Sequence, residues 1–203
     1  LSIRKNARGR NHLINIAENV IIRGGKIIMN GEGNQLTINE NCRLRNVRIE
    51  ILGSKNTITV NKGVMFYEKA WLCIEGNNCM ISIGSKTTIG SADIFCGESN
   101  TTINIGSDCM LSRDIVMNTS DFHSIIDQET GERINLPKNI NIGNHVWIGN
   151  GVSIMKGAKI RDNSVIASKA LVPGKAFEEH LLLGGLPAHV IRENINWTRD
   201  KLP

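Results

Sequence analysis

Residues 142–177 read IGNHVW, IGNGVS, IMKGAK, IRDNSV, IASKAL and VPGKAF, a run of six hexapeptides. A branched aliphatic residue opens each of them, and a small residue follows four positions later, in turn Val146, Val152, Ala158, Ser164, Ala170 and Ala176. A helix places apolar residues three and four apart and an alternating strand two apart, so neither explains a period of six. Short parallel strands joined by tight corners do explain it, and the run predicts a parallel β-solenoid.

The first half of the chain carries a looser form of the same repeat. Its aliphatic positions are Ile16, Ile38, Val60, Ile83, Ile105 and Ile142, at steps of 22, 22, 23, 22 and 37 residues. The small positions four residues later are Val20, Cys42, Val64, Thr87, Cys109 and Val146. Three hexapeptides make a coil of 18, so each early coil carries a few extra turn residues. The pattern G-x-x-N at 31–34, 53–56 and 97–100 supplies them, because Gly and Asn suit tight corners.

The last step of this series is 15 residues longer than the one before it. The excess lies in 118–139, NTSDFHSIIDQETGERINLPKN, which keeps no period. A loop this long in a compact fold is usually functional or disordered. We therefore predict one all-β domain over residues 1–203, with early coils at 11–117, an extruded loop at 118–137, regular coils at 138–176 and a C-terminal cap at 177–203. A solenoid needs its last coil covered, and the tail at 193–201 is expected to do this.

Composition and charge restrict the kind of protein. The chain has 203 residues, is 40% hydrophobic and carries a net charge of +5 with a pI near 9.1, which favours an anionic ligand or substrate. Nucleic acid is disfavoured because no basic motif is interleaved with aromatic residues. The absence of a signal peptide, of a long apolar stretch and of any C-x-x-C pair among five cysteines predicts a cytoplasmic protein with no membrane span.

The run IGNHVWIGNGVSIMKGAKI and the later GGLPAHVIRENINW resemble the hexapeptide-repeat acyltransferase family. The motif SDFHSI, followed 24 residues after its His by Trp147, is similar to the polysaccharide O-acetyltransferases of that family, which include enzymes that modify polysialic acid capsules. The resemblance implies a left-handed β-helix with three parallel sheets, assembled as a homotrimer with active sites between subunits. It also implies acetyl-CoA as acyl donor and a bacterial surface glycan, expected to be acidic, as acceptor.

The chemistry of such a transfer places demands on the residues. A sugar hydroxyl is a poor nucleophile, so its attack on a thioester needs a base, and His suits this role near neutral pH. His123 is the one His on the extruded loop, and the resembled family uses an equivalent loop His as the base. Either Asp121 or a backbone carbonyl is a candidate to orient its ring. The remaining histidines form no close pair, so we predict no catalytic metal.

The donor site is predicted from the resemblance. Trp147 occupies an outward position where the other repeats carry small or polar residues, and the corresponding Trp of the related capsule enzymes lies at the active site near the acyl donor. The pantetheine arm is expected to meet Gly149, Ala167 and Ser168. The remaining predicted contacts lie toward the nucleotide end and are Lys175, Pro187, His189 and Arg192. Two motifs depart from the family, which often has Thr-Lys where this chain reads Pro-Gly-Lys at 173–175, and Pro-Ala-Lys where it reads Pro-Ala-His at 187–189.

Two alternatives to O-acetylation remain open at this stage. N-acetylation of an amino sugar or a nucleotide sugar would use the same fold, and it too requires loss of a proton, so a His base does not separate the two reactions. A non-catalytic solenoid that binds a surface through ranks of Thr-x-Thr is disfavoured, because only Thr57–Thr59 gives that motif clearly.

Overall fold

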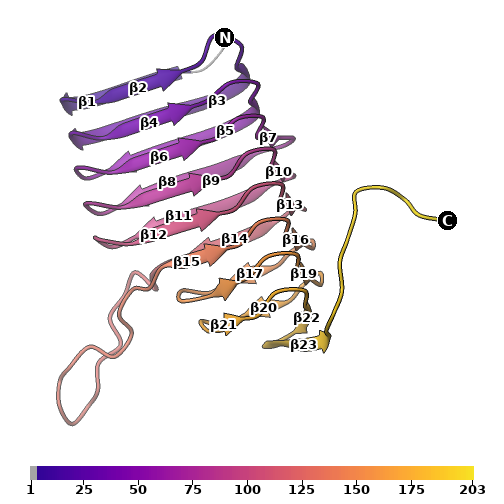
Figure 1. Cartoon of the computed structure of the whole chain (residues 1–203). Helices are drawn as coiled ribbons and strands as arrows, with labels where there is room; N and C mark the ends of the chain where they lie inside the picture. Colours follow the sequence, from indigo (N-terminus) through magenta and orange to yellow (C-terminus); the bar gives the residue numbers. More distant parts are fainter. Residues whose placement is uncertain (1–3) are drawn as a thin grey trace.

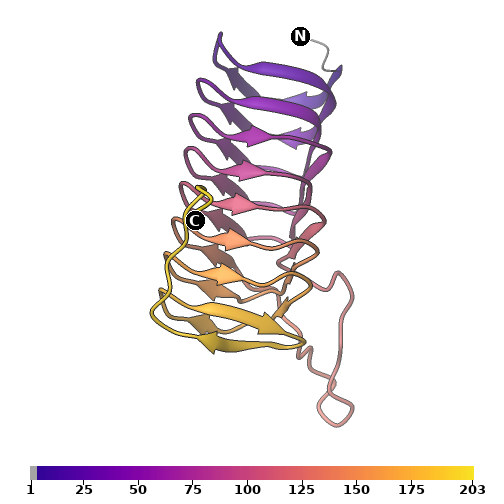
Figure 2. The same cartoon turned by 90° about the vertical axis from the view of Figure 1, so that its right-hand side faces the viewer.

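The computed structural model describes residues 4–203, which form a parallel β-helix whose coils stack along one axis (Figures 1 and 2). Each regular coil turns through three flat faces. The first face holds one strand from each of eight coils. These strands are β2 (Leu13–Ile16), β4 (Gln35–Ile38), β6 (Thr57–Val60), β9 (Met80–Ile83), β12 (Thr102–Ile105), β15 (Ile140–Ile142), β18 (Lys159–Ile160) and β21 (Ala176–Phe177).

The second and third faces are joined at the N-terminal end by strands that run across both. These shared strands are β3 (Ile21–Glu32) and β5 (Arg43–Leu52). The second face continues with β7 (Met65–Phe66), β10 (Thr88–Ile89), β13 (Met110–Leu111), β16 (Trp147–Ile148), β19 (Val165–Ile166), β22 (Leu182–Gly185) and β23 (Ala188–Arg192). The third face holds β1 (Arg4–Arg10), β8 (Ala70–Glu75), β11 (Ala92–Gly97), β14 (Ile115–Asn118), β17 (Ser153–Ile154) and β20 (Leu171–Val172).

Hydrogen bonding therefore gives two sheets, of 15 and 8 strands, where the resemblance implied three. The difference arises because β3 and β5 pass the corner without a break. Gly25 allows this in β3, since its φ of +109° favours glycine and a Cβ there would lie 2.3 Å from the carbonyl oxygen of Val47. Geometrically the three faces remain distinct.

Alternation along each strand fills the interior of the coil. In β6, for example, Ile58 and Val60 are fully buried, while Thr57 and Thr59 point outward. The predicted aliphatic positions stack in register from coil to coil, from Ile16 through Ile142 to Ile160. Each fully buried aliphatic side chain contributes roughly 1.5–3 kcal/mol to stability, so these stacks hold the coils together.

The small positions of the repeat, which we expect where the chain is crowded at a corner, are also buried, except for Ala176. The corner at 173–175 is one residue shorter than the preceding corners at 155–158, 161–164 and 167–170, so Phe177 pairs with Ile160 and takes the aliphatic position. Ala176 is consequently exposed and the prediction for it was wrong.

Three edges separate the faces, and two of them carry extra chain. The loop edge lies between the third and first faces, where the loop at 119–139 leaves the wall after β14 and projects from it (Figures 1 and 2). The tail edge lies between the first and second faces. The plain edge, between the second and third faces, carries neither and includes residues 149–152 and 167–170.

The C-terminal tail lies along the tail edge, and only the antiparallel hairpin of β22 and β23 ends the solenoid. Beyond Arg192 the chain turns back. Its Trp197 ring stacks on His145 at 4.2 Å between ring centroids, and Arg199 donates to the Thr88 hydroxyl at 3.0 Å. This course differs from the expected cap because Trp197, at 8% exposure, is buried by ring stacking and by a 2.8 Å hydrogen bond from its indole nitrogen to the His145 carbonyl oxygen on the side of the solenoid.

Candidate active site

The root of the loop is sharply bent just before His123. Phe122 has a φ of +60° and its ring packs edge-on against Phe95 of β11, at 6.4 Å between ring centroids. Gly97 makes room for this ring, since a Cβ there would lie 2.6 Å from Phe122. The Ser120 hydroxyl accepts a hydrogen bond from the Phe122 amide at 2.8 Å. The turn that presents His123 is thus fixed by packing and by a side-chain bond.

Asn135 joins the two arms of the loop. Its side-chain amide donates to Asp121 Oδ2 and to the carbonyl oxygen of His123, both at 2.8 Å. Its Oδ1 accepts from the backbone amide of Ile125, also at 2.8 Å. Asn135 is only 9% exposed, so these bonds are shielded from water and hold the backbone around His123.

Two ion pairs anchor the loop to the wall of the solenoid. Arg133 binds Glu98 through two bonds of 2.6 and 2.7 Å, and Lys156 Nζ lies 2.5 Å from Asp121 Oδ2. Hydrogen bonds from Arg133 and then from Ser120 lower the pKa of Glu98 to about 2. The bond from Lys156 likewise lowers the pKa of Asp121. Both carboxylates are therefore held in the charged form.

The imidazole of His123 projects from this scaffold into solvent. His123 is exposed, and its ring has no hydrogen bond or ion pair within residues 4–203. Asp121 is engaged by Lys156 and Asn135, so its carboxylate does not orient the imidazole here. Asp121 instead acts on the loop backbone, and its carbonyl oxygen accepts from the His123 amide at 2.7 Å. The ring is left open to receive a proton from an incoming group.

Trp147 lies on the second face, in β16, with 39% of its surface exposed. Its ring is 6.0 Å from that of Trp197 in the tail. From β10 to β22 the residue directly after the buried aliphatic of this face is small in each coil, namely Gly90, Ser112, Gly149, Ala167 and Gly184. The surface beside Trp147 is consequently smooth.

Gly149, Ala167 and Ser168 lie together on the plain edge. Residues that contact a single pantetheine arm would have to lie together in this way. The Gly149 amide donates to the carbonyl oxygen of Ile166 at 2.8 Å, and a Cβ on Gly149 would lie 2.6 Å from the Ser168 nitrogen. The two coils thus meet backbone to backbone. Any side chain larger than hydrogen at position 149 would force them apart.

The remaining predicted donor contacts divide between two places. Pro187, His189 and Arg192 lie in the hairpin at the end of the second face, all exposed. Lys175 lies on the loop edge, where its Nζ is 5.0 Å from the centroid of the Phe177 ring. Lys175 is therefore on a different side of the coil from the other donor residues.

The other histidines have structural partners. The ring of His145 bonds Asp108 at 2.8 Å, and the rings of His12 and His180 bond backbone carbonyl oxygens at 3.1 and 3.0 Å. No group of three or more His, Cys, Asp or Glu side chains in the described part of the chain is placed to hold a metal ion. All five cysteines are free and buried. Within residues 4–203 we find no helix long and apolar enough to cross a membrane.

His123 and Trp147 do not meet within one chain. His123 stands on the loop edge, and Trp147 stands on the second face, which is the face opposite that edge in a three-sided coil. The predicted base and the predicted donor surface can act on one substrate only if they come from different copies of the chain.

No sequence pattern marks Glu98, Asn135 or Lys156 as partners that hold the loop. They come from a corner, from the loop itself and from a later coil, and only the stacking of coils brings them together. The one available signal was the pair of charges on the loop, Asp121 and Arg133, which need counter-charges on the wall.

The ion pair between Glu98 and Arg133 predicts that the stability of the loop depends on pH. Because the folded-state pKa of Glu98 lies well below its ordinary value of 4.5, its stabilising effect is complete above pH 4.5 and is lost as the pH falls toward 2. At pH 7, Glu98→Gln should accelerate amide hydrogen exchange of 121–135 relative to wild type, and the difference should shrink as the pH falls through this window. The control is Glu129→Gln, an exposed acid in the same loop. Equal exchange rates in both variants at pH 7 would show that Glu98 does not anchor the loop.

The chain is similar to known bacterial acetyltransferases in both sequence and structure. Residues 139–174 match the model described as Bacterial transferase hexapeptide (six repeats). The chain is 30% identical to the polysialic acid O-acetyltransferase OatWY in a solved structure, covering 100% of this chain and 93% of that one with a TM-score of 0.88. The polysialic acid-specific acetyltransferase NeuO is 28% identical over 98% of this chain and 89% of its own, with a TM-score of 0.77.

Two curated sequences are similar over shorter segments. A polysialic acid O-acetyltransferase of Neisseria meningitidis is 38% identical over 69 residues, and one of Escherichia coli O1:K1 / APEC is 41% identical over 61 residues. These segments span 34% and 30% of this chain and 32% and 19% of the relatives' own lengths. The chain belongs to the hexapeptide-repeat acyltransferase family. The fold is the left-handed parallel β-helix of that family, as predicted.

Proposed function

We propose that this protein is an O-acetyltransferase that transfers the acetyl group of acetyl-CoA to a hydroxyl of an acidic bacterial glycan, with polysialic acid as the acceptor class. The observation that carries the proposal is the presentation of His123 by a rigid, ion-paired loop on a solenoid similar along its whole length to two polysialic acid acetyltransferases. The net charge of +5 suits an acceptor with carboxylates.

The role of His123 is to take the proton of the acceptor hydroxyl as its oxygen bonds to the acetyl carbon. Acetyl-CoA supplies the activated acyl group, and coenzyme A leaves as the C–S bond breaks, with the electron pair on its sulfur. His123 then returns the proton to the departing sulfur, so that it ends the cycle unchanged. An exposed ring on a fixed backbone suits this work, because the base must reach a hydroxyl at hydrogen-bond distance in a defined pose. Asp121, Asn135 and Lys156 hold the loop in that pose.

The donor fits the second face beside and beyond Trp147. The smooth strip through Gly149, Ala167 and Gly184 suits a slender arm, and it ends at the β22–β23 hairpin. There His189 and Arg192 are exposed, and neither has an acidic partner among the described residues, so they are open to phosphate oxygens. Gly149, Ala167, Ser168 and Pro187 are the proposed contacts of the arm. Because Lys175 lies on the loop edge, its proposed partner is the donor bound to a neighbouring subunit.

A homotrimer completes the site in this proposal. Cyclic assembly would bring the loop of one subunit to the second face of the next at the level of Trp147, so that His123 and Trp147 of different chains face one substrate. This arrangement follows from their separation within one chain.

Acetyl-CoA binding tests the donor half of the proposal. Titration calorimetry with the purified protein should give an affinity in the micromolar range, weakened at least about tenfold when the CoA lacks its 3′-phosphate, because charge-assisted bonds to Arg192 and its neighbours are lost. Binding that is absent, or indifferent to that phosphate, contradicts the assignment of the donor.

Trp147→Ala should weaken the use of the donor. We expect a rise of about tenfold in KM for acetyl-CoA, because the ring offers a large apolar surface beside the arm. Size-exclusion chromatography with light scattering provides the control on assembly. A Trp147→Ala protein that becomes monomeric would make this ring an interface residue instead of a donor contact.

A further inference from the structure

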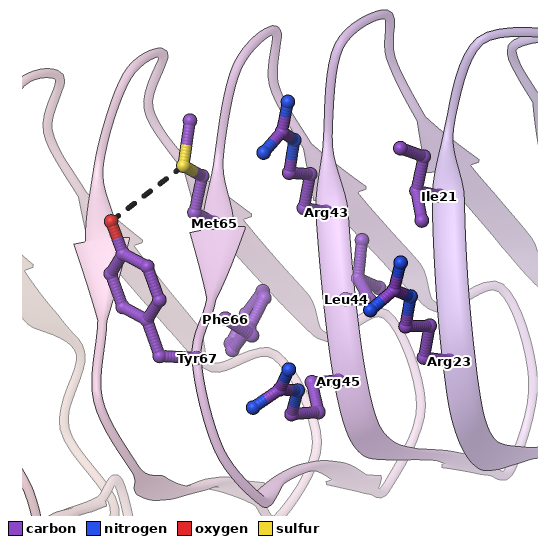
Figure 3. A pocket seen from close by; sticks show the side chains of 8 residues that line it. All are labelled: Ile21, Arg23, Arg43, Leu44, Arg45, Met65, Phe66 and Tyr67. Atoms are coloured by element: carbon purple, nitrogen blue, oxygen red, sulfur yellow. Dashed lines mark hydrogen bonds between the residues drawn. The ribbon is translucent and has the colours of Figure 1, made fainter.

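A cavity of about 290 Å³ opens on the second face at the N-terminal end of the solenoid, far from the loop (Figure 3). Three arginines line it, Arg23 from β3 and Arg43 and Arg45 from β5. Its apolar part is formed by Ile21, Met65 and Tyr67, with the Tyr67 hydroxyl 3.7 Å from the sulfur of Met65 (Figure 3). The cavity thus combines cationic groups with an aromatic ring and aliphatic surface.

The positive charge of this cavity has no internal counterpart. Arg23 and Arg45 are directly paired in register on neighbouring strands, and Arg43 lies two residues before Arg45. None of the three has a hydrogen bond or ion pair within residues 4–203, and no acidic residue lines the cavity. Other arginines of the chain, such as Arg48, Arg113 and Arg133, do bind a carboxylate. Adjacent like charges repel each other, so an anionic ligand would relieve a cost that the free protein bears.

The cavity is aligned with Trp147. A single outward rank runs along the second face through Arg43, Met65, Thr88, Met110 and Trp147, one residue per strand. A second cavity, of about 320 Å³, lies along this rank and shares Tyr67 with the first. It reaches Met110 and is lined by Arg199 and by the Arg113–Glu68 pair. The two cavities lie in a row along the rank that leads to Trp147, and together they are called the groove.

We propose that this groove binds a polymer with regularly spaced carboxylates, as a subsite for the distal part of the acceptor chain. Arg23, Arg43 and Arg45 bind its carboxylates, for which the guanidinium is the best-matched side chain, and Tyr67 packs on the apolar face of a sugar ring. The proposal rests on the proposed function for the identity of the acceptor. The donor strip leaves Trp147 in the opposite direction along the same face, so the two substrates meet at this ring.

The length of the groove makes the subsite selective for chain length. Four strand spacings separate Arg43 from Trp147, which is about 19 Å at about 4.8 Å per spacing. A short oligomer that places a hydroxyl beside Trp147 does not extend to Arg43. A polymer reaches both, and its affinity gains from the arginines without any change at the reacting hydroxyl.

The test uses the double variant Arg43→Ala with Arg45→Ala. Its matched control is Arg4→Ala with Arg8→Ala, which removes the same charge from exposed positions on the third face. Binding of long-chain polysialic acid to each protein is measured without acetyl-CoA, at low and at physiological ionic strength, with neutral dextran as a reference polymer. We expect the groove variant to weaken polysialic acid binding at least about tenfold and to lose most of its salt dependence, since two charge-assisted contacts are removed. The control should change less than about threefold, because no groove contact is lost.

Steady-state transfer then separates this proposal from the proposed function. In the groove variant, KM for long polysialic acid should rise about tenfold, while kcat and the KM for a two- or three-unit sialic acid oligomer stay unchanged. Equal effects in groove and control variants, or an equal loss with the oligomer, overturn the subsite. Wild-type protein that binds the polymer through these arginines but acetylates neither acceptor refutes the proposed function and leaves the subsite standing. A groove variant that changes oligomeric state would make this face an interface between copies and overturn the proposal.

Discussion

Replacing His123 with alanine is expected to lower kcat for acetyl transfer by about a thousandfold, within the range that a positioned general base contributes. The hydroxyl would then have to attack while still protonated, because no other imidazole lies on the loop. The fold should persist, since the ring is exposed and bonds nothing in the described structure. The measurement is thiol release from acetyl-CoA in the presence of polysialic acid, together with the amount of acetyl on the polymer.

The control for this experiment is Gln128→Ala, which truncates another exposed side chain of the same loop. Both variants should elute with the wild-type oligomeric state and melt at the wild-type temperature. A His123→Ala enzyme that retains more than about a tenth of wild-type kcat would sink the assignment of His123 as the base.

Mixed oligomers should recover activity from two impaired variants when acetyl-CoA is held well below its KM, a condition in which Trp147→Ala is expected to turn over about tenfold more slowly than wild type. If His123 and Trp147 act on one substrate from different subunits, an assembly containing His123→Ala and Trp147→Ala chains includes sites with both wild-type residues. Random cyclic assembly of the two in equal amounts yields about one quarter of the sites intact. Co-expressed trimers, purified without selection for mixed composition and assayed at this low donor concentration, are therefore expected to show about one quarter of wild-type turnover.

The comparison for this experiment is a mixture of the two variants purified separately and not allowed to exchange subunits. That mixture should show only the residual activity of its components. If the co-expressed trimers are no more active than the unexchanged mixture, each active site lies within a single chain, and the opposed positions of the loop edge and the second face have been misinterpreted.

The periodic parts of this fold were predictable because each coil repeats a local rule. A large aliphatic residue fills the interior and a small one fits the corner, so Ile16 to Ile142 could be placed in register from spacing alone. The rule fails at Ala176, where one corner residue is missing and the next aromatic side chain takes the interior position. Spacing also could not separate three sheets from two, because that depends on whether β3 and β5 bend without a break.

The site was less predictable, for a physical reason. The position of His123 on an insertion drew attention to it, but what holds it is contributed by residues that the period does not mark. Glu98 and Lys156 reach the loop from coils before and after it. The tail was hard to predict for another reason. A hydrophobic residue such as Trp197 could be buried equally well against the end or the side of the solenoid. It is the stacking on His145 that selects the side.

The most direct test of the proposed function is the product of the reaction. Polysialic acid is incubated with acetyl-CoA and the wild-type protein, and the chains are analysed by mass spectrometry before and after mild alkali, with the His123→Ala variant in parallel. We predict acetyl groups on the polymer that alkali removes, as esters require, and almost none with the variant. An unmodified polymer, or an alkali-resistant acetyl group formed equally well by the variant, would contradict O-acetylation by this site.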